Sequence, residues 1–115
     1  MATTRTSLAT HFSHLSPPWQ RVFRTCQAVG FGSVEGLGVR RGEPVFGPGC
    51  VARHERKLGG GDAGGRPPID AADFQLKLAH VELIQEFARL PDGAGVTVEV
   101  RHGLPARLVR VETLA

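Results

Sequence analysis

The feature that most constrains this chain is a correspondence between its two halves. Residues 19–46 align without a gap with residues 80–107, and an apolar helical pattern coincides in both, as Val22 falls on Leu83. Self-similarity of this kind indicates a repeated structural unit. We therefore infer a duplication. The identical pairs, most of them in one Val-Arg-x-Gly-x-Pro pattern, are Gly32 with Gly93, Val39 with Val100, Arg40 with Arg101, Gly42 with Gly103 and Pro44 with Pro105.

The first half predicts a helix followed by a β-hairpin. Ser16 is a candidate N-cap because two prolines follow it, and Gly30 and Gly32 end the helix. A strand is expected over 34–40, then a turn at Arg41-Gly42 and a return strand over 44–46. The side chains expected to share the covered face of this unit are Trp19, Val22, Phe23, Cys26 and Val29 of the helix and Glu35, Leu37 and Val39 of the strand.

The second half repeats this arrangement with a clearer strand signal. Asp70 or Asp73 is expected to cap a helix that runs to about Leu90. Valines at 96, 98 and 100 alternate with polar residues, which is typical of a strand with one buried face. A turn at His102-Gly103 then leads to a last strand over 106–112.

These elements predict an α+β fold, a two-layer sandwich built from a duplicated α-β-β unit. Its four-stranded antiparallel sheet carries two helices on one face, because a lone hairpin is unstable without cover. We expect a flexible tail over 1–15 and one domain over 16–115. The domain contains repeats at 16–46 and 70–113, joined by a Gly/Pro-rich loop over 47–69.

One segment resembles a known family. Phe31-Gly32-Ser33-Val34-Glu35, followed by Val39-Arg40-Arg41-Gly42 and Val45, is similar to the small bacterial YezD-like helix–hairpin proteins. The resemblance covers residues 20–46, and the second half departs from it at residues 92–95. That family is uncharacterised, so the resemblance implies a fold element and no activity.

Composition narrows the class of protein. No apolar run approaches the ~18 residues of a membrane span. Two cysteines, Cys26 and Cys50, favour a reducing compartment over a disulfide scaffold. Arginine far outnumbers lysine, and Ala, Gly and Pro are abundant, as in proteins of GC-rich bacterial genomes. We expect a bacterial, cytoplasmic protein with no membrane association.

No motif dictates a chemistry. His11 and His14 form the one close histidine pair, without the further ligands of a zinc site. Cys26 aligns with Phe87, which favours packing over reactivity, and the Gly-rich run at 59–65 lacks the Gly-Lys-Ser/Thr of a phosphate-binding loop. We therefore expect no catalytic residues, no metal and no cofactor.

Two hypotheses of function remain, both of them binding functions. In the first, the partner is a protein or a second copy, as in a homodimer, bound through the edge strands or through the open sheet face, which Gly36 and Gly38 make thin. In the second, the net charge of +3 allows a nucleic acid to be held between two Arg-bearing hairpin tips. The residues expected at such a nucleic-acid or partner contact are Arg40, Arg41, Arg101, His102, Arg53, Arg56 and Lys57.

Overall fold

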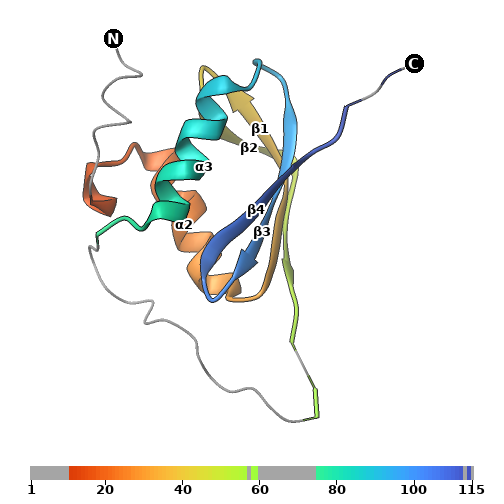
Figure 1. The fold of residues 1–115 in the computed structure, drawn as a ribbon. Coiled ribbons are helices and arrows are strands. Elements are labelled where there is room, and N and C mark those ends of the chain that lie inside the picture. The colour runs from red at the N-terminus through yellow and green to blue at the C-terminus, as the bar shows by residue number, and fades with distance from the viewer. Residues whose placement is uncertain (1–10, 57, 60–74, 113, 115) are drawn as a thin grey trace.

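A computed structural model describes residues 11–56, 58–59, 75–112 and 114 of the chain. The chain order is helix, hairpin, helix, hairpin, after a short 3-10 helix (Figure 1). The elements are η1 (Phe12–His14), α2 (Pro17–Val29), β1 (Gly32–Arg40), β2 (Glu43–His54), α3 (Leu78–Arg89), β3 (Gly95–Arg101) and β4 (Leu104–Arg110).

The four strands form one antiparallel sheet in the order β2-β1-β3-β4. The first strand of each hairpin is therefore central, and the second strand of each hairpin lies at an edge. Helices α2 and α3 both cover the same face of the sheet (Figure 1). This arrangement confirms the predicted α+β fold with a four-stranded antiparallel sheet and two helices.

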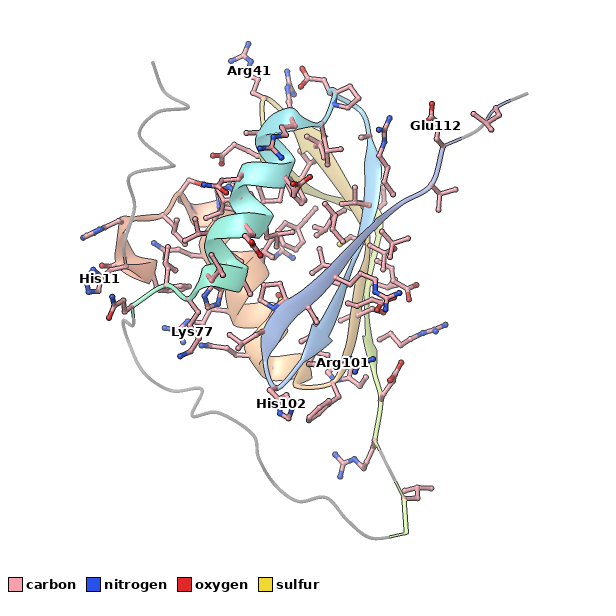
Figure 2. All side chains as sticks on the ribbon, viewed as in Figure 1. His11, Arg41, Lys77, Arg101, His102 and Glu112 are labelled. Atoms are coloured by element: carbon pink, nitrogen blue, oxygen red, sulfur yellow. The ribbon has the colours of Figure 1, made fainter. Side chains whose placement is uncertain are left out.

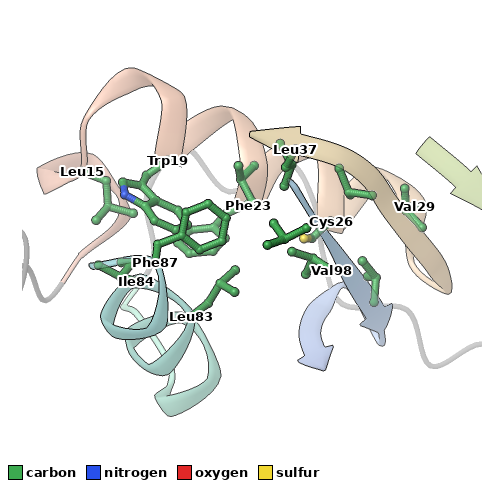
Figure 3. Packing of buried hydrophobic residues seen from close by; sticks show 14 of the residues in the cluster. Leu15, Trp19, Phe23, Cys26, Val29, Leu37, Leu83, Ile84, Phe87 and Val98 are labelled. Carbon is green, nitrogen blue, oxygen red and sulfur yellow. The ribbon is translucent and has the colours of Figure 1, made fainter. Parts of the chain in front are cut away.

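The core lies between the helices and the sheet (Figure 3). The indole of Trp19 and the ring of Phe87 meet edge to face, with centroids 4.8 Å apart, so one residue from each helix forms its centre. Burying one large apolar side chain stabilises a fold by about 1.5–3 kcal/mol. The other buried apolar residues include Val22, Phe23 and Cys26 of α2, Leu83 and Ile84 of α3, and Val34, Leu37, Val39, Val96, Val98 and Val100 of the sheet.

The two hairpin turns have the same backbone geometry. Arg41 and His102 have φ of 53° and 55°, and the glycines after them have φ of 76° and 74°. Two successive residues with positive φ define a type I′ turn, whose twist matches that of the flanking strands. The predicted turns at Arg41-Gly42 and His102-Gly103 therefore lie where the strands reverse.

Strand β1 contains an irregularity that the alternation of its residues does not predict. Its register with both neighbours shifts between residues 34 and 37, and Gly36 has φ of 79°. The extra residue places Glu35 on the face away from the helices, while Leu37 is fully buried. The expectation that Glu35 shares a face with Leu37 is wrong for this reason.

Strand β2 continues into the segment predicted as a loop from residue 47. Its pairing with β1 jumps from Phe46 opposite Leu37 to Val51 opposite Glu35, and then runs on to His54. The interruption consists of residues 47–50, Gly-Pro-Gly-Cys. Strand pairing therefore resumes after the break, and the rest of the predicted loop, residues 60–69, lies outside the described residues.

The regions before the two helices also differ from expectation. Phe12 and Leu15 are buried and belong to the core. The guanidinium carbon of Arg24 lies 4.3 Å from the centroid of the Phe12 ring. Residues 11–15 are therefore not a free tail. Helix α3 begins at Leu78, and the proposed caps at 70 and 73 lie outside the described residues. Within the part of the chain that is described, no helix is long and apolar enough to cross a membrane.

Candidate interaction surface

The face of the sheet turned away from the helices, here called the outer face, carries a row of charged and polar side chains. Ser33 on β1 lies opposite Arg53 on β2 and Glu99 on β3, and Glu99 lies opposite Arg107 on β4. Because side chains alternate between the two faces, these four residues line up across all four strands. The row therefore crosses the whole width of the sheet.

The charges on the outer face are arranged in pairs. Arg53 Nε lies 3.5 Å from a carboxylate oxygen of Glu35, and Arg107 Nε lies 3.5 Å from one of Glu99. The hydroxyl of Ser33, which is buried, donates to Glu35 at 2.9 Å. In both pairs the guanidinium group lies on an edge strand and the carboxylate on a central strand. Exposed pairs contribute only about 0–1 kcal/mol each, so their pattern bears on partner choice more than on stability.

One end of the outer face is hollowed. An open hollow of about 390 Å³ is bordered by Ser33, Glu99, Arg101 and the rings of Phe31 and His102. These two rings meet edge to face with centroids 4.9 Å apart, and Phe31 remains 39% exposed. Sequence reasoning missed this aromatic pair. The signal was Phe31 placed between two glycines just before a strand, outside the apolar period of the helix.

The two glycines proposed for close approach by a partner have different roles. A Cβ on Gly36 would lie 2.4 Å from the carbonyl oxygen of Gly49, so Gly36 makes room for β2 of its own chain. A Cβ on Gly38 would meet Val45 Cβ at 3.5 Å, an ordinary contact. Gly38 also lies opposite Gly95 on β3, and this glycine pair forms a thin strip beside Val45.

The proposed basic contacts divide between the two ends of the sheet. Because β1 and β3 are antiparallel neighbours, the tip with Arg40 and Arg41 lies at the opposite end from the tip with Arg101 and His102 (Figure 2). Arg53 borders the same hollow as Arg101 and His102. Arg56 is exposed beyond the end of β2, and Lys57 lies outside the described residues.

The buried titratable groups lie in the core, away from the outer face. Burial raises the pKa of the Cys26 thiol to about 12 and lowers the pKa of His80 to about 4, with the charge of Lys77 adding to the second shift. Burial also raises the pKa of Cys50, against the opposing effect of Arg21. Neither cysteine is in a disulfide. Within the described residues, no three His, Cys, Asp or Glu side chains gather in a way that could hold a metal ion.

Comparison with known proteins leaves the surface as the basis for any assignment. No protein family, no curated protein and no solved structure matches this chain. The resemblance of residues 20–46 to the YezD-like proteins stays a prediction.

Proposed function

We propose that this chain is a non-enzymatic bacterial protein of the cytoplasm that acts by binding, with a second copy of itself as the partner on the outer face. The observation that carries the proposal is the pairing of exposed valines with a thin glycine strip. Val45 is 41% exposed and Val51 is 53% exposed, and both lie on the outer side of β2.

The shape of this region favours contact with another copy. Val45 stands beside the strip formed by Gly38 and Gly95, so a protruding side chain and a place without side chains lie next to each other. In a two-fold dimer the same patch is used by both subunits. Each Val45 can then pack over the glycine strip of the other subunit, which buries apolar surface on both sides.

The charges of the outer face suit the same partner. Arg53 and Arg107 lie on edge strands and Glu35 and Glu99 on central strands. Across the sheet these charges run plus, minus, minus, plus, so a second copy displaced sideways by two strand spacings, about 10 Å, sets guanidinium groups against carboxylates. A polyanion would meet the two carboxylates as well as the arginines. The mixed charge therefore favours a protein over the nucleic-acid alternative, in which Arg53, Arg101 and His102 at the hollow would supply the contacts.

The experiment is sedimentation velocity over a range of concentrations, on the wild type and two variants. Gly38→Leu fills the strip at a position where a side chain has ordinary room, so it is expected to shift the protein to monomer. Ala28→Leu places the same leucine side chain at an exposed site on α2 and is expected to leave association unchanged. A wild type that stays monomeric at about 0.5 mM, or a Gly38→Leu protein that associates equally well, overturns the proposal.

We also infer that the fold arose by duplication of one helix–hairpin unit. Gly32 lies opposite Val100, and at the aligned positions the N–H of Gly93 donates to the carbonyl of Val39 at 2.8 Å. The same pair of aligned positions thus meets twice, once in each direction between the halves, as a two-fold axis would require. This symmetry supports the duplication independently of the sequence alignment.

A further inference from the structure

A second surface lies on the other side of the sheet, between α3 and the edge strand β4. It is a groove of about 180 Å³, with Ala79, Leu83, Pro105 and Leu108 as its apolar part and Glu82 and Glu86 on its rim. It shares no residue with the strip of Gly38 and Gly95. Arg107 borders this groove and also belongs to the outer face.

The corresponding place in the first half is filled by the chain itself. Phe46 on β2 packs against the core, and the guanidinium of Arg21 on α2 lies 4.1 Å over its ring. Phe46 lies opposite Leu37 in the sheet, just as Leu108 lies opposite Val98, the residue aligned with Leu37. The second half thus has the smaller Leu108 where the first half has a phenylalanine.

The charge at this place is also reversed between the halves. Glu82 aligns with Arg21, so a carboxylate lies where the first half has a guanidinium. Glu86 is bound by Arg89 at 2.9 Å, and Arg107, which also borders the groove, is paired with Glu99. Glu82 is the one charged residue of the groove with no ion-pair partner among the described residues. A ligand with one basic side chain complements it.

The edge of β4 beside the groove is open to strand addition. Among the described strands, β4 and β2 are the two edges. Pro44 and Pro48, together with the break in pairing at 47–50, interrupt β2, whereas the one proline of β4 is its second residue, Pro105. A proline has no N–H to donate, so β2 is a poor template. Its pairing with β3 shifts at Ala106, and the regular part of β4 after this shift, residues 107–110, offers backbone donors and acceptors.

We propose that β4 and this groove bind an extended peptide segment of a partner protein, which adds a fifth strand to the sheet. Backbone hydrogen bonds to β4 hold the segment, an apolar side chain enters the groove against Leu83 and Leu108, and a lysine or arginine two residues away meets Glu82. Strand addition with a pocket for alternate side chains is an established way of recognising peptides. The groove has room for one side chain of about leucine size.

Fluorescence anisotropy with a labelled heptapeptide, Ser-Thr-Leu-Thr-Lys-Thr-Ser, tests this proposal. Its leucine and lysine are two residues apart and face the same side of an extended strand. Two control peptides replace the lysine by glutamate, or the central threonine by proline. We expect binding of the first peptide with Kd below about 1 mM and at least tenfold weaker binding of both controls.

Variants of the protein locate the site. Leu108→Phe combined with Glu82→Arg recreates the filled arrangement of the first half, and it is expected to weaken binding at least tenfold while the protein stays folded. Glu82→Gln keeps the shape and should lower affinity for the lysine peptide and raise affinity for the glutamate peptide, because the repulsion between two carboxylates is removed. Glu55→Gln, beyond β2, and Gly38→Leu, on the outer face, are expected to bind like the wild type.

Two results would overturn the proposal. One is absence of binding to the leucine–lysine peptide at about 1 mM protein. The other is equal affinity in the wild type and the Leu108→Phe, Glu82→Arg protein, whose folding is checked by circular dichroism and by the emission of Trp19. Loss of self-association in Gly38→Leu with intact peptide binding would show that the two surfaces act separately.

Discussion

The backbone N–H of Arg41 donates to a carboxylate oxygen of Asp92 at 2.7 Å, and this bond joins residues 51 positions apart. Asp92 aligns with Phe31 and Arg41 aligns with His102, and those two residues also touch, through their rings. Each hairpin turn is thus held by the residue that precedes the first strand of the other half. The contact is the same in position and different in chemistry.

The Arg41–Asp92 bond predicts a measurable effect on stability. Asp92→Ala removes an acceptor for a turn N–H and is expected to lower the free energy of unfolding by about 1 kcal/mol. Asp92→Asn keeps an oxygen acceptor and should lose less than half of that. Urea denaturation followed by the emission of Trp19, the single tryptophan, measures both. Unchanged stability in Asp92→Ala would show that the bond contributes nothing.

Substitution by alanine is expected to lower the stability of the fold strongly at Gly36 and hardly at all at Gly38. At Gly36 the positive φ and the carbonyl of Gly49 both oppose a methyl group, so Gly36→Ala should destabilise the fold by about 2 kcal/mol or more. At Gly38 the added methyl has ordinary room, and Gly38→Ala should change stability by less than about 0.5 kcal/mol. Thermal unfolding of the two variants, monitored by circular dichroism, is the comparison. Equal losses would contradict the bulge in β1.

His80 predicts that the fold is weakened by mild acid. Its pKa is about 4 in the folded protein and near 6.5 when exposed, so between these values the unfolded chain binds a proton that the folded protein does not. Stability is therefore complete above pH 6.5 and falls as the pH approaches 4, by up to about 3 kcal/mol. Urea midpoints across this range measure the loss.

A variant isolates the contribution of His80. His80→Leu removes the titrating group, so its stability should decline less steeply between pH 6.5 and 4 than that of the wild type. His80→Leu also removes the acceptor for the N–H of Lys77. The free energy of unfolding of this variant at each pH is therefore compared with its own value at pH 7. His54→Gln, at an exposed site, is the matched control. Identical slopes in His80→Leu and the wild type would rule out this role.

The two cysteines are expected to differ in reactivity. Cys26 is fully buried with a pKa of about 12, so its thiolate is scarce and out of reach in the folded protein. Cys50 on β2 is partly exposed and should react with Ellman's reagent before Cys26 does. In Cys50→Ser the fast reaction should disappear until denaturant is added. A fast reaction that persists in folded Cys50→Ser would place Cys26 outside the core.

The nucleic-acid alternative predicts a particular salt dependence. The two Arg-bearing tips lie at opposite ends of the sheet. On the outer face between these tips, carboxylates lie between the arginines. We therefore expect any affinity for duplex DNA to vary weakly with salt concentration. Anisotropy titrations measure the slope of log affinity against log salt concentration. We expect a slope that corresponds to fewer than about three phosphate contacts. A steep slope that Arg40→Glu combined with Arg101→Glu abolishes would restore the alternative.

The parts of the fold that sequence predicts well are those with a strong local signal. The alternating valines predict strand β3 because alternation places all of them on one face. The glycines after Arg41 and His102 predict the two turns because the backbone there has a positive φ. The break in β1 at Gly36 and the continuation of β2 past residue 47 depend on pairing between distant segments. No local pattern contains that information. The burial of Phe12 depends likewise on its contact with Arg24.

The candidate surfaces were less predictable than the fold. The sequence indicates an exposed sheet face, but the roles of Gly36 and Gly38 separate only when the carbonyl of Gly49 is seen beside one and an ordinary contact with Val45 beside the other. The groove beside β4 becomes visible only by comparing Phe46 with Leu108 in equivalent positions of the sheet. Both conclusions need distances that alignment alone does not supply.

The pairing of β1 with β3 has a consequence for how the protein can be divided. These strands are the backbone seam between the halves, and each half keeps its own hairpin on its own side of it, while α2 also contacts β4 and α3 also contacts β2. Two polypeptides, residues 1–59 and 75–115, each contain one whole side of the seam. When they are made separately and mixed, we expect them to recognise each other and restore the sheet, so the protein is a natural starting point for a two-fragment complementation pair.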